Sequence, residues 1–522
     1  MALTAVLASA CTGAGAPERP NVVLLVFDDM GYGDLGCYGQ KLIETPNIDA
    51  LAAQGIVFTD MYTASPLSAP SRCSLLTGLH SGHSQIRGND ERWARPEGMV
   101  LKEADWYFDA IHDNPDLEGQ WPMAPGTATL ATMMRSAGYR TAMVGKWGLG
   151  GPGSESAPND MGFDYFFGFN CQMLAHSYYP DYLWENGTKV FTGNEYMPVN
   201  RRLDPGADPY DIRSYDKFNQ KEYSPDLMFD KLEAWITGAE TAEEASGATG
   251  SSKAPFFLMW TTTVPHSTVQ APEDEVMHYV EKLGEEPTPV TDGGWYYPVL
   301  YPHSAYAAMI THIDAQVGRL VDTLKARGLF DNTLIIITSD NGPACNSNSP
   351  MEYFNSGGPF KCRKGWGKST LREGGIRMPF VACWGSRLKP GRCNYAGNFT
   401  DIMPTLAELS GAEAPDTDGI SFVPSLKGAK QPQHPHLYWE FPGGKGWLAV
   451  RCGPWKGLVQ NVSKGSAAME LYNLEDDPRE STDLSAEHPE IIEQMWQIIA
   501  AEHGEVPSHN PKFELEITYP EK

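Results

Sequence analysis

The sequence lacks apolar stretches of membrane-spanning length, and it lacks closely spaced pairs of cysteines. After the first 20 residues, no stretch is long and apolar enough to cross a bilayer. The nine cysteines are scattered, and no two of them show the CxxC spacing of a cysteine-bound metal. Without Cys11 eight remain, an even number that permits disulfides without requiring them. The sequence therefore argues against both a bundle of membrane-spanning helices and a cysteine metal centre.

Positive charge is also scarce. The chain has 40 lysines and arginines against 66 acidic residues, a net charge of −26. This balance argues against nucleic acid and anionic membrane surfaces as general partners. An anionic substrate would be repelled at long range, so its pocket would have to be locally basic.

The N-terminus consists mainly of small and apolar residues up to Pro17. Residues 8–11, Ala-Ser-Ala-Cys, approximate a lipoprotein cleavage box, but the positively charged region that usually precedes it is missing. We expect residues 1–18 to be an export leader, with a lipid on Cys11 as the only membrane attachment. A disordered leader is the alternative.

The length of 522 residues is too great for one simple core, so a large and a smaller domain are expected. Four continuous apolar runs predict strands buried on both faces of a sheet: 21–27, 139–145, 256–260 and 334–338. Helices are predicted at 48–54 with Asn47 as its cap, at 127–136 and at 306–327. We therefore expect an α/β domain over residues 19–430, with a large mixed, mostly parallel sheet between helices.

The pattern changes near residue 430. Short strands separated by glycine-rich turns are predicted at 437–441, 447–451 and 456–459, followed by a helix at 489–502. Residues 431–522 are therefore expected to form a C-terminal α+β subdomain with an antiparallel sheet. The segment 238–254 is rich in small and acidic residues and predicts an exposed insertion.

Polar residues follow each of the four predicted strands in the larger domain. These residues are Asp28 and Asp29, Lys146, His266, and Asp340 with Asn341. Ligands of open α/β sheets bind outside the carboxyl ends of the strands. We therefore expect these six side chains to meet at one edge of the sheet.

Two pairs of oxygen-donating residues in this set predict a metal site. Asp28, Asp29, Asp340 and Asn341 all offer oxygen atoms, which hard divalent cations prefer. One such pair alone could equally be a helix cap or a solvated charge. Two pairs that each follow a strand favour a metal, and calcium tolerates irregular carboxylate coordination best.

A Ser/Pro-rich stretch predicts a helix that begins near Ser68. Pro70 suits its first turn, and Leu75 and Leu76 would bury it. Ser68 would then lie where free N–H groups and the helix dipole favour an anion, with Arg72 one turn along. Taken alone, this stretch could be an ordinary turn before an amphipathic helix.

The Ser68 stretch, Ser68-x-Pro-x-Arg72 followed by Leu-Leu-Thr-Gly, resembles the signature of the type I sulfatases in the alkaline phosphatase superfamily. Four other stretches resemble that family's motifs in the same order along the chain: 27–34, 145–150, 338–342 and 368–377. The resemblance implies an alkaline-phosphatase-like fold and an enzyme similar to bacterial arylsulfatases and carbohydrate sulfatases.

The resemblance also implies roles for individual residues. Ser68 would be oxidised by a maturation enzyme to formylglycine, whose hydrate is the nucleophile, and Arg72 would hold that hydrate. Lys146 and Lys368 would clamp the sulfate, and His266 would protonate the leaving oxygen. Asp28, Asp29, Asp340 and Asn341 would hold one calcium ion.

The chain departs from the family at Gly148, where many members carry a histidine assigned to the elimination step. His176 is a candidate to replace it, and equally a substrate contact. A sugar pocket could be lined by His176, Arg87, Asn89, Trp439 and Glu440. These residues could equally be packing or surface residues.

The expected function is the hydrolysis of sulfate esters on carbohydrate, such as mucin glycans or glycosaminoglycans. The enzyme would be exported to the periplasm or outer membrane of an anaerobic Gram-negative bacterium, and nucleic acid would not be a partner. Two alternatives stay open. One is a phosphatase or phosphodiesterase in which unmodified Ser68 attacks phosphorus, and the other is a sulfated-glycan-binding protein without turnover.

Overall fold

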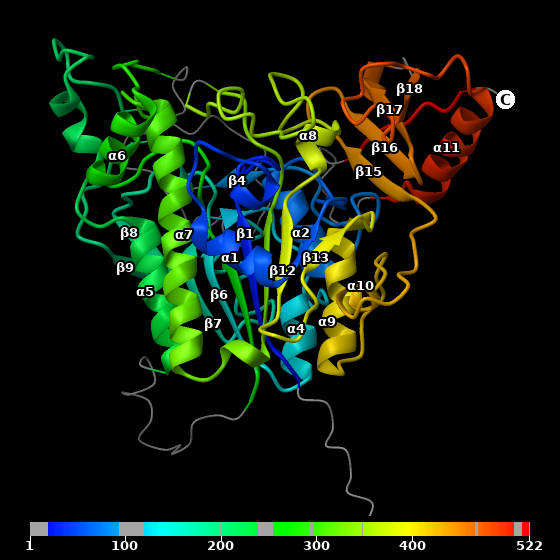
Figure 1. Ribbon diagram of the computed structural model, residues 1–522, viewed down its shortest axis with the longest axis horizontal. Coiled ribbons are helices and arrows are strands. Elements are labelled where there is room, and N and C mark those ends of the chain that lie inside the picture. Colours follow the sequence, from blue (N-terminus) through cyan, green and yellow to red (C-terminus); the bar gives the residue numbers. More distant parts are fainter. Residues whose placement is uncertain are drawn as a thin grey trace, which may run out of the picture.

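The computed structural model describes residues 19–92, 119–198, 201–238, 254–291, 296–346, 348–464, 468–505 and 514–520. The predicted leader with Cys11, and most of the predicted insertion 238–254, lie outside these residues. Figure 1 shows a large unit built around one long sheet, with a smaller sheet beside it. The expected α/β fold is confirmed.

Five parallel strands form the centre of a ten-stranded sheet. They are β11 (Thr333–Ser339), β1 (Asn21–Phe27), β10 (Phe256–Thr261), β6 (Arg140–Lys146) and β7 (Tyr165–Phe169). On one side the sheet continues through β12 (Phe380–Cys383), β2 (Ile56–Phe58) and β13 (Gly391–Cys393). On the other side it ends in the antiparallel strands β8 (Tyr182–Glu185) and β9 (Thr188–Phe191). The sheet is therefore mixed and mostly parallel.

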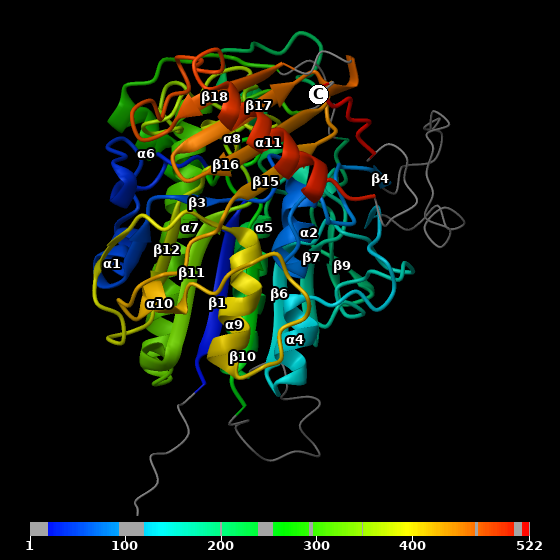
Figure 2. The same cartoon turned by 90° about the vertical axis from the view of Figure 1, so that its right-hand side faces the viewer.

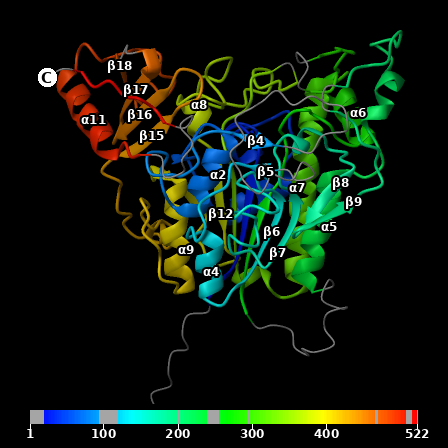
Figure 3. The same cartoon turned by 180° about the vertical axis from the view of Figure 1, so that it is seen from behind.

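Two helical layers cover the two faces of this sheet (Figures 2 and 3). One layer contains α1 (Pro46–Gln54), α5 (Ser224–Thr237), α6 (Glu273–Leu283) and α7 (Pro302–Ala326). The other contains α2 (Ser68–Thr77), α4 (Leu130–Ser136) and α9 (Ile402–Ser410). Along β1, Val23 and Leu25 pack into the first layer, whereas Val22 and Leu24 pack into the second. This alternation explains why the strand is a continuous apolar run.

The predicted helices exist, but their first residues differ. The helix α7 begins at Pro302, one turn before the predicted start, because proline fits the first turn. The prediction of Asn47 as the cap of α1 is wrong: Thr45 is the N-cap. Asn47 instead donates from its backbone N and from Nδ2 to Asp314 on α7, at 3.1 and 2.8 Å.

The C-terminal strands form a separate antiparallel sheet. It contains β15 (Leu437–Phe441), β16 (Trp447–Cys452), β17 (Trp455–Gln460) and β18 (Met469–Asn473), with α11 (Pro489–Glu502) against one face. Its other face packs through Trp439 and Leu458 on Tyr62 and Leu371 of the larger unit. The sequence pattern did not predict β18.

The remaining elements are short. They are β3 (Met61–Tyr62), β4 (Glu91–Arg92), β5 (Gly119–Gln120), β14 (Gly397–Asn398), α8 (Glu373–Ile376), α10 (Val423–Leu426) and the 3-10 turns 36–38, 174–176, 212–218, 330–332, 399–401 and 462–464. All eight cysteines in the described part of the chain are free thiols, and Cys73 is buried. Within the same residues, no helix has the length and apolarity needed to cross a membrane.

Candidate active site

The two pairs of oxygen-bearing residues, Asp28 with Asp29 and Asp340 with Asn341, lie side by side at the carboxyl edge of the large sheet. They meet because β1 and β11 are parallel neighbours whose last residues, Phe27 and Ser339, are paired. Asp340 donates its backbone N–H to the carbonyl of Phe27 at 2.9 Å, and Asp29 donates its own to Asp340 Oδ1 at 3.2 Å. Asp29 has a φ of 66°, so the chain turns sharply there and both carboxylates remain at the edge.

Ser68 lies against this edge as the first residue of α2, with its side chain fully buried. Its Oγ is 3.2 Å from Asp28 Oδ1 and 3.3 Å from Asn341 Oδ1. Asn341 directs its Nδ2 away, to Asp29 Oδ1 at 2.7 Å and to the carbonyl of Gly342 at 2.9 Å. Its Oδ1 therefore faces Ser68 together with the carboxylate of Asp28.

Three cationic side chains surround the carboxylates. Arg72 donates from Nε and Nη2 to Asp340 Oδ2 at 3.1 and 2.9 Å. Lys146 Nζ lies 2.5 Å from Asp28 Oδ2, and Lys368 Nζ lies 2.6 Å from Asp29 Oδ1. Three cations thus face three carboxylates, and the acidic excess of the whole chain does not extend to this site.

The three carboxylates do not share one electrostatic environment. Burial alone would raise the pKa of Asp28, but Lys146 and the other nearby cations outweigh burial and hold it well below its usual range. Burial raises the pKa of Asp29, and burial together with the Asp28 charge raises that of Asp340 to about 6. At Asp29 and Asp340 the nearby cations therefore do not fully offset burial.

The same side chains fit a hard divalent cation. Four oxygen-bearing residues converge at this edge, as the sequence predicted, and a bound cation would offset the burial that raises the pKa values of Asp29 and Asp340. Three possible ligand atoms, one each from Asp28, Asp29 and His266, lie within 4.8 Å of one another. Because most of the donors are oxygens, the set suits calcium better than zinc.

His266 follows β10 and faces the acidic edge. Its Nδ1 donates to the carbonyl of Ser267 at 2.6 Å, so Nε2 is the free nitrogen, and it lies 3.7 Å from Asp29 Oδ2. Burial, reinforced by Lys368, lowers the pKa of His266 to about 3. The ring of His176 stacks on it, with centroids 5.0 Å apart. The structure thus brings His176 to the site.

Asn89 also lies beside the site. Its side chain is exposed, and its Oδ1 accepts the backbone N–H of Ala69, the residue after Ser68, at 3.0 Å. Its Nδ2 donates to Gln172 Oε1 at 3.3 Å. Asn89 therefore connects the first turn of α2 to the chain that follows β7.

Arg87, Trp439 and Glu440 are not brought to the site. Arg87 and Glu440 form an ion pair with each other, and both are buried. Trp439 is also buried, and its Nε1 donates to the carbonyl of Thr63 at 2.8 Å. These three side chains join the small sheet to the large unit. They are packing residues and do not line a sugar pocket at this edge.

Two residues at the site were missed by the sequence patterns. Thr63 donates from Oγ1 to the carbonyl of Asp340 at 2.6 Å and contacts Ser71 Oγ, which supports both Asp340 and α2. No motif indicates Thr63. Gln172 follows β7, and the signal was present there, because the apolar run 165–169 ends in the polar Asn170.

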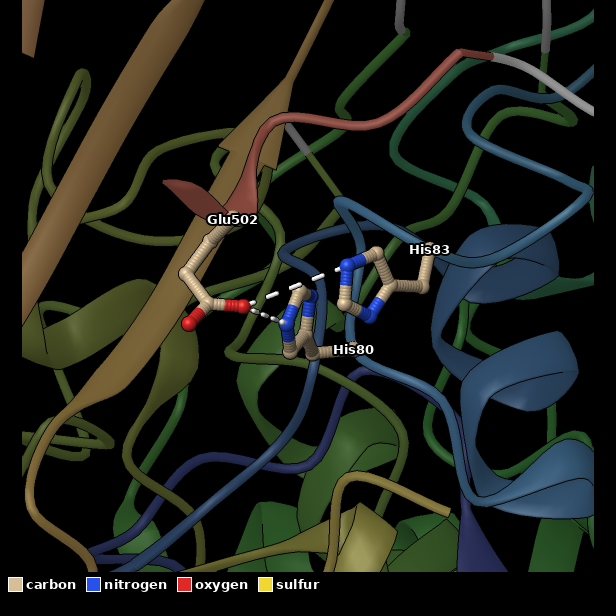
Figure 4. Close-up of side chains that lie close together, drawn as sticks. All are labelled: His80, His83 and Glu502. Carbon is tan, nitrogen blue, oxygen red and sulfur yellow. Dashed lines mark hydrogen bonds and ion pairs between the residues drawn. The ribbon is translucent and has the colours of Figure 1, made fainter. Parts of the chain in front are cut away.

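A second group of possible ligands lies away from this edge (Figure 4). His80 Nε2 is 3.1 Å and His83 Nε2 is 3.9 Å from Glu502 Oε2 on α11. The backbone N–H of Gly82 donates to His80 Nδ1 at 3.1 Å, so the proton of this ring is on Nε2 and points at Glu502. A metal at Nε2 would have to displace that proton. The group therefore joins the loop after α2 to the C-terminal helix by hydrogen bonds.

Comparison with known proteins gives consistent matches. The family model described as Sulfatase matches residues 20–412. N-acetylgalactosamine-6-sulfatase of Canis lupus familiaris is 29% identical over 87% of this chain and 74% of its own length. Arylsulfatase A of Homo sapiens is 28% identical over 94% of this chain and 89% of its own. The crystal structure of Ps i-CgsB in complex with k-i-k-neocarrahexaose has a TM-score of 0.68 and 24% identity, and the match covers 95% of this chain and 96% of that one.

Proposed function

Because the chain belongs to the sulfatase family and is a sulfuric ester hydrolase, we propose that it removes sulfate from sulfated carbohydrate. The observation that carries this proposal is the position of Ser68, whose Oγ lies between Asp28 and Asn341 at the edge where three cations gather. The related N-acetylgalactosamine-6-sulfatase supports a sugar substrate.

We further propose that Ser68 is oxidised to formylglycine, which would supply the nucleophile, by a maturation enzyme of the host. A calcium ion would be held by Asp28, Asp29, Asp340 and Asn341, and would place positive charge beside the oxygens of the sulfate. Buried Ser68 and the oxygen-rich ligand set support both assignments.

The cationic residues bind and orient the sulfate. Lys146 is buried and Lys368 is partly buried, and Asp28 and Asp29 hold them, so their charges are preorganised for an anion that carries no proton. The two N–H groups that Arg72 donates to Asp340 fix its guanidinium one turn along α2 from Ser68. This arrangement stabilises negative charge as it develops on the sulfate.

His266 is positioned to move a proton at Nε2. The hydrogen bond from Nδ1 to Ser267 fixes the ring, so Nε2 is the nitrogen that faces the site. Negative charge on a bound sulfate would raise the low pKa of His266 and favour a proton on Nε2. From there the proton can be donated to the oxygen of the departing sugar.

Export, a lipid on Cys11 and an anaerobic bacterial host remain proposals, as do mucin glycans or glycosaminoglycans as substrates and the domain limits 1–18, 19–430 and 431–522. The leader motif supports export and a lipid on Cys11, and the serine at position 68 supports an anaerobic bacterial host.

The proposal is tested by assaying the purified native protein, with calcium, on sulfated sugars and on phosphate esters of the same sugars. We expect release of sulfate and little release of phosphate, and no release by a Ser68→Ala variant. Preferential release of phosphate, with unmodified Ser68 required, would replace the sulfatase proposal by the phosphatase alternative.

A further inference from the structure

Gly148 follows the active-site residue Lys146 closely and provides no side chain of its own. It lies two residues after Lys146 and has a φ of 76°. A Cβ built on Gly148 would lie 3.1 Å from Gln172 Nε2 and 3.4 to 3.5 Å from Gln172 Cγ and Cδ. The amide of Gln172 therefore occupies the space beside Gly148.

The amide of Gln172 is held in one orientation. Its Oε1 accepts from Asn89 Nδ2 at 3.3 Å, and Asn89 Oδ1 accepts the N–H of Ala69, beside Ser68. The backbone N–H of Gln172 is also fixed, since it donates to Gln120 Oε1 at 2.8 Å. Gln172 Nε2 is thus the free end of a chain of amides that starts at the first turn of α2.

This free end is a buried donor without an acceptor. Gln172 is 5% exposed, and its Nε2 has no hydrogen-bond partner among the described residues. Buried polar groups in proteins almost always have a partner, so a ligand that brings an acceptor here is favoured. A sulfate monoester presents three terminal oxygens that only accept hydrogen bonds, which matches this requirement.

We propose that Gln172 is a substrate-contacting residue whose Nε2 donates a hydrogen bond to a sulfate oxygen. The inference rests on the proposed placement of the sulfate beside Lys146. Gln172 adds a donor without adding charge, in the space that Gly148 leaves open beside it. The amide does not titrate, so this contact stays constant across the working pH range.

The variants Gln172→Glu and Gln172→Leu test the contact. The glutamate keeps an acceptor for Asn89 but presents a negative charge to the sulfate, whereas leucine removes the donor. Binding of inorganic sulfate by calorimetry, with calcium present, and kcat/KM on a sulfate ester are measured together with Tm. The control is Gln220→Leu, whose side chain bonds Glu195 far along the sequence from these motifs.

We expect Gln172→Leu to weaken sulfate binding about tenfold with a Tm close to wild type, and Gln172→Glu to weaken it more, with a lower Tm because its carboxylate is buried. Asn89→Ala, at an exposed position, leaves the amide unanchored and should weaken sulfate binding by roughly threefold. It tests the chain of amides even if a Gln172 variant does not fold.

Sulfate binding needs no turnover, so this test is separate from the proposed function. A wild type that hydrolyses sulfate esters, together with Gln172 variants whose sulfate Kd and kcat/KM are unchanged, overturns the assignment of Gln172 alone. Variants that lose activity and Tm in parallel, with unchanged sulfate Kd, would assign Gln172 to packing and also overturn it.

Discussion

Two buried clusters of charged side chains are built from the same residue types and differ in what they do. One is the active-site edge around Asp28, Asp340 and Lys146. The other lies beneath the small sheet, where Lys456 Nζ is 2.8 Å from Glu373 Oε1 and 3.0 Å from Glu480 Oε1.

The second cluster is compensated by its own residues. Tyr62 donates to Glu373 Oε2 at 2.7 Å, and Arg377 Nη1 lies 3.1 Å from the same oxygen. Burial alone would raise the pKa of Glu373, but Lys456 and Arg377 outweigh it and lower the pKa to about 2. Burial does raise the pKa of Glu480, but four cations, Lys456, Arg372, Arg377 and Arg451, act on the two carboxylates of this cluster. At the active-site edge only three cations face three carboxylates, and the pKa values of two of these, Asp29 and Asp340, are raised. A cluster short of positive charge is suited to bind a cation, whereas a compensated one holds two parts of the fold together.

The largest effect should come from the uncompensated cluster. Asp340→Ala removes an oxygen ligand and the partner of Arg72, so we expect calcium binding to be lost and kcat/KM to fall on the order of 10³-fold. Calorimetry with calcium and an assay on a sulfate ester check this. Activity at the wild-type level would contradict the ligand assignment.

The compensated cluster should affect folding more than chemistry. Lys456→Met leaves Glu373 and Glu480 buried without their shared cation, which should lower the free energy of unfolding by about 3 kcal/mol. Denaturant titration measures this change in the free energy of unfolding, and the exposed pair of Arg201 and Asp204 provides the control. We expect Arg201→Met to leave the free energy of unfolding close to that of the wild type, because solvent screens this pair. Equal changes in the two variants would remove the distinction between the clusters.

His266→Ala removes the proposed proton donor of the first cluster. Loss of the proton donor should reduce kcat on sugar sulfates by about 10²-fold, because a sugar alkoxide is a poor leaving group. An activated aryl sulfate, whose leaving oxygen needs no proton, should lose much less. Measurements of kcat on the two substrates test this difference. Equal losses of kcat on both would contradict the general-acid role of His266.

The smallest effect is expected from a third, partly exposed cluster. Burial lowers the pKa of His312, but hydrogen bonds to Asp226 and Glu275, both at 2.8 Å, outweigh burial and raise it to about 9. A raised folded-state pKa stabilises the protein below pH 6.5, and this stabilisation is lost as the pH rises through 9.

We therefore expect the wild type to lose about 2 kcal/mol between pH 6.5 and 10 that a His312→Gln variant does not lose. Denaturant titrations across this range measure the difference, with the exposed His278→Gln as the control. The same pH dependence in wild type and His312→Gln would show that His312 is not the titrating group.

Local patterns predicted the residues at the active-site edge better than those between the sheets. Asp28, Asp340 and Lys146 each directly follow or end a buried strand, so their meeting could be inferred from the parallel sheet alone. The pairing of Arg87 with Glu440 joins residues 353 positions apart, and no local pattern records it. For the same reason Trp439 and Glu440 were expected in a sugar pocket, although the structure packs them between the sheets.

Short elements and supporting residues were also beyond prediction. The strand β2 has three residues, and its place beside β12 depends on tertiary packing rather than on its own sequence. Thr63 acts through one hydroxyl group on the backbone of Asp340, and a lone threonine carries no pattern. Asn47 suits a helix cap by residue type, but Asp314 on α7 competes for its side chain.

The most direct test of the account is the mass of the Ser68-containing peptide from protein purified from its native host. We predict the loss of two hydrogen atoms at Ser68, as conversion to formylglycine requires. Unmodified serine in protein that hydrolyses sulfate esters, from a host that matures other sulfatases, would contradict the proposed nucleophile.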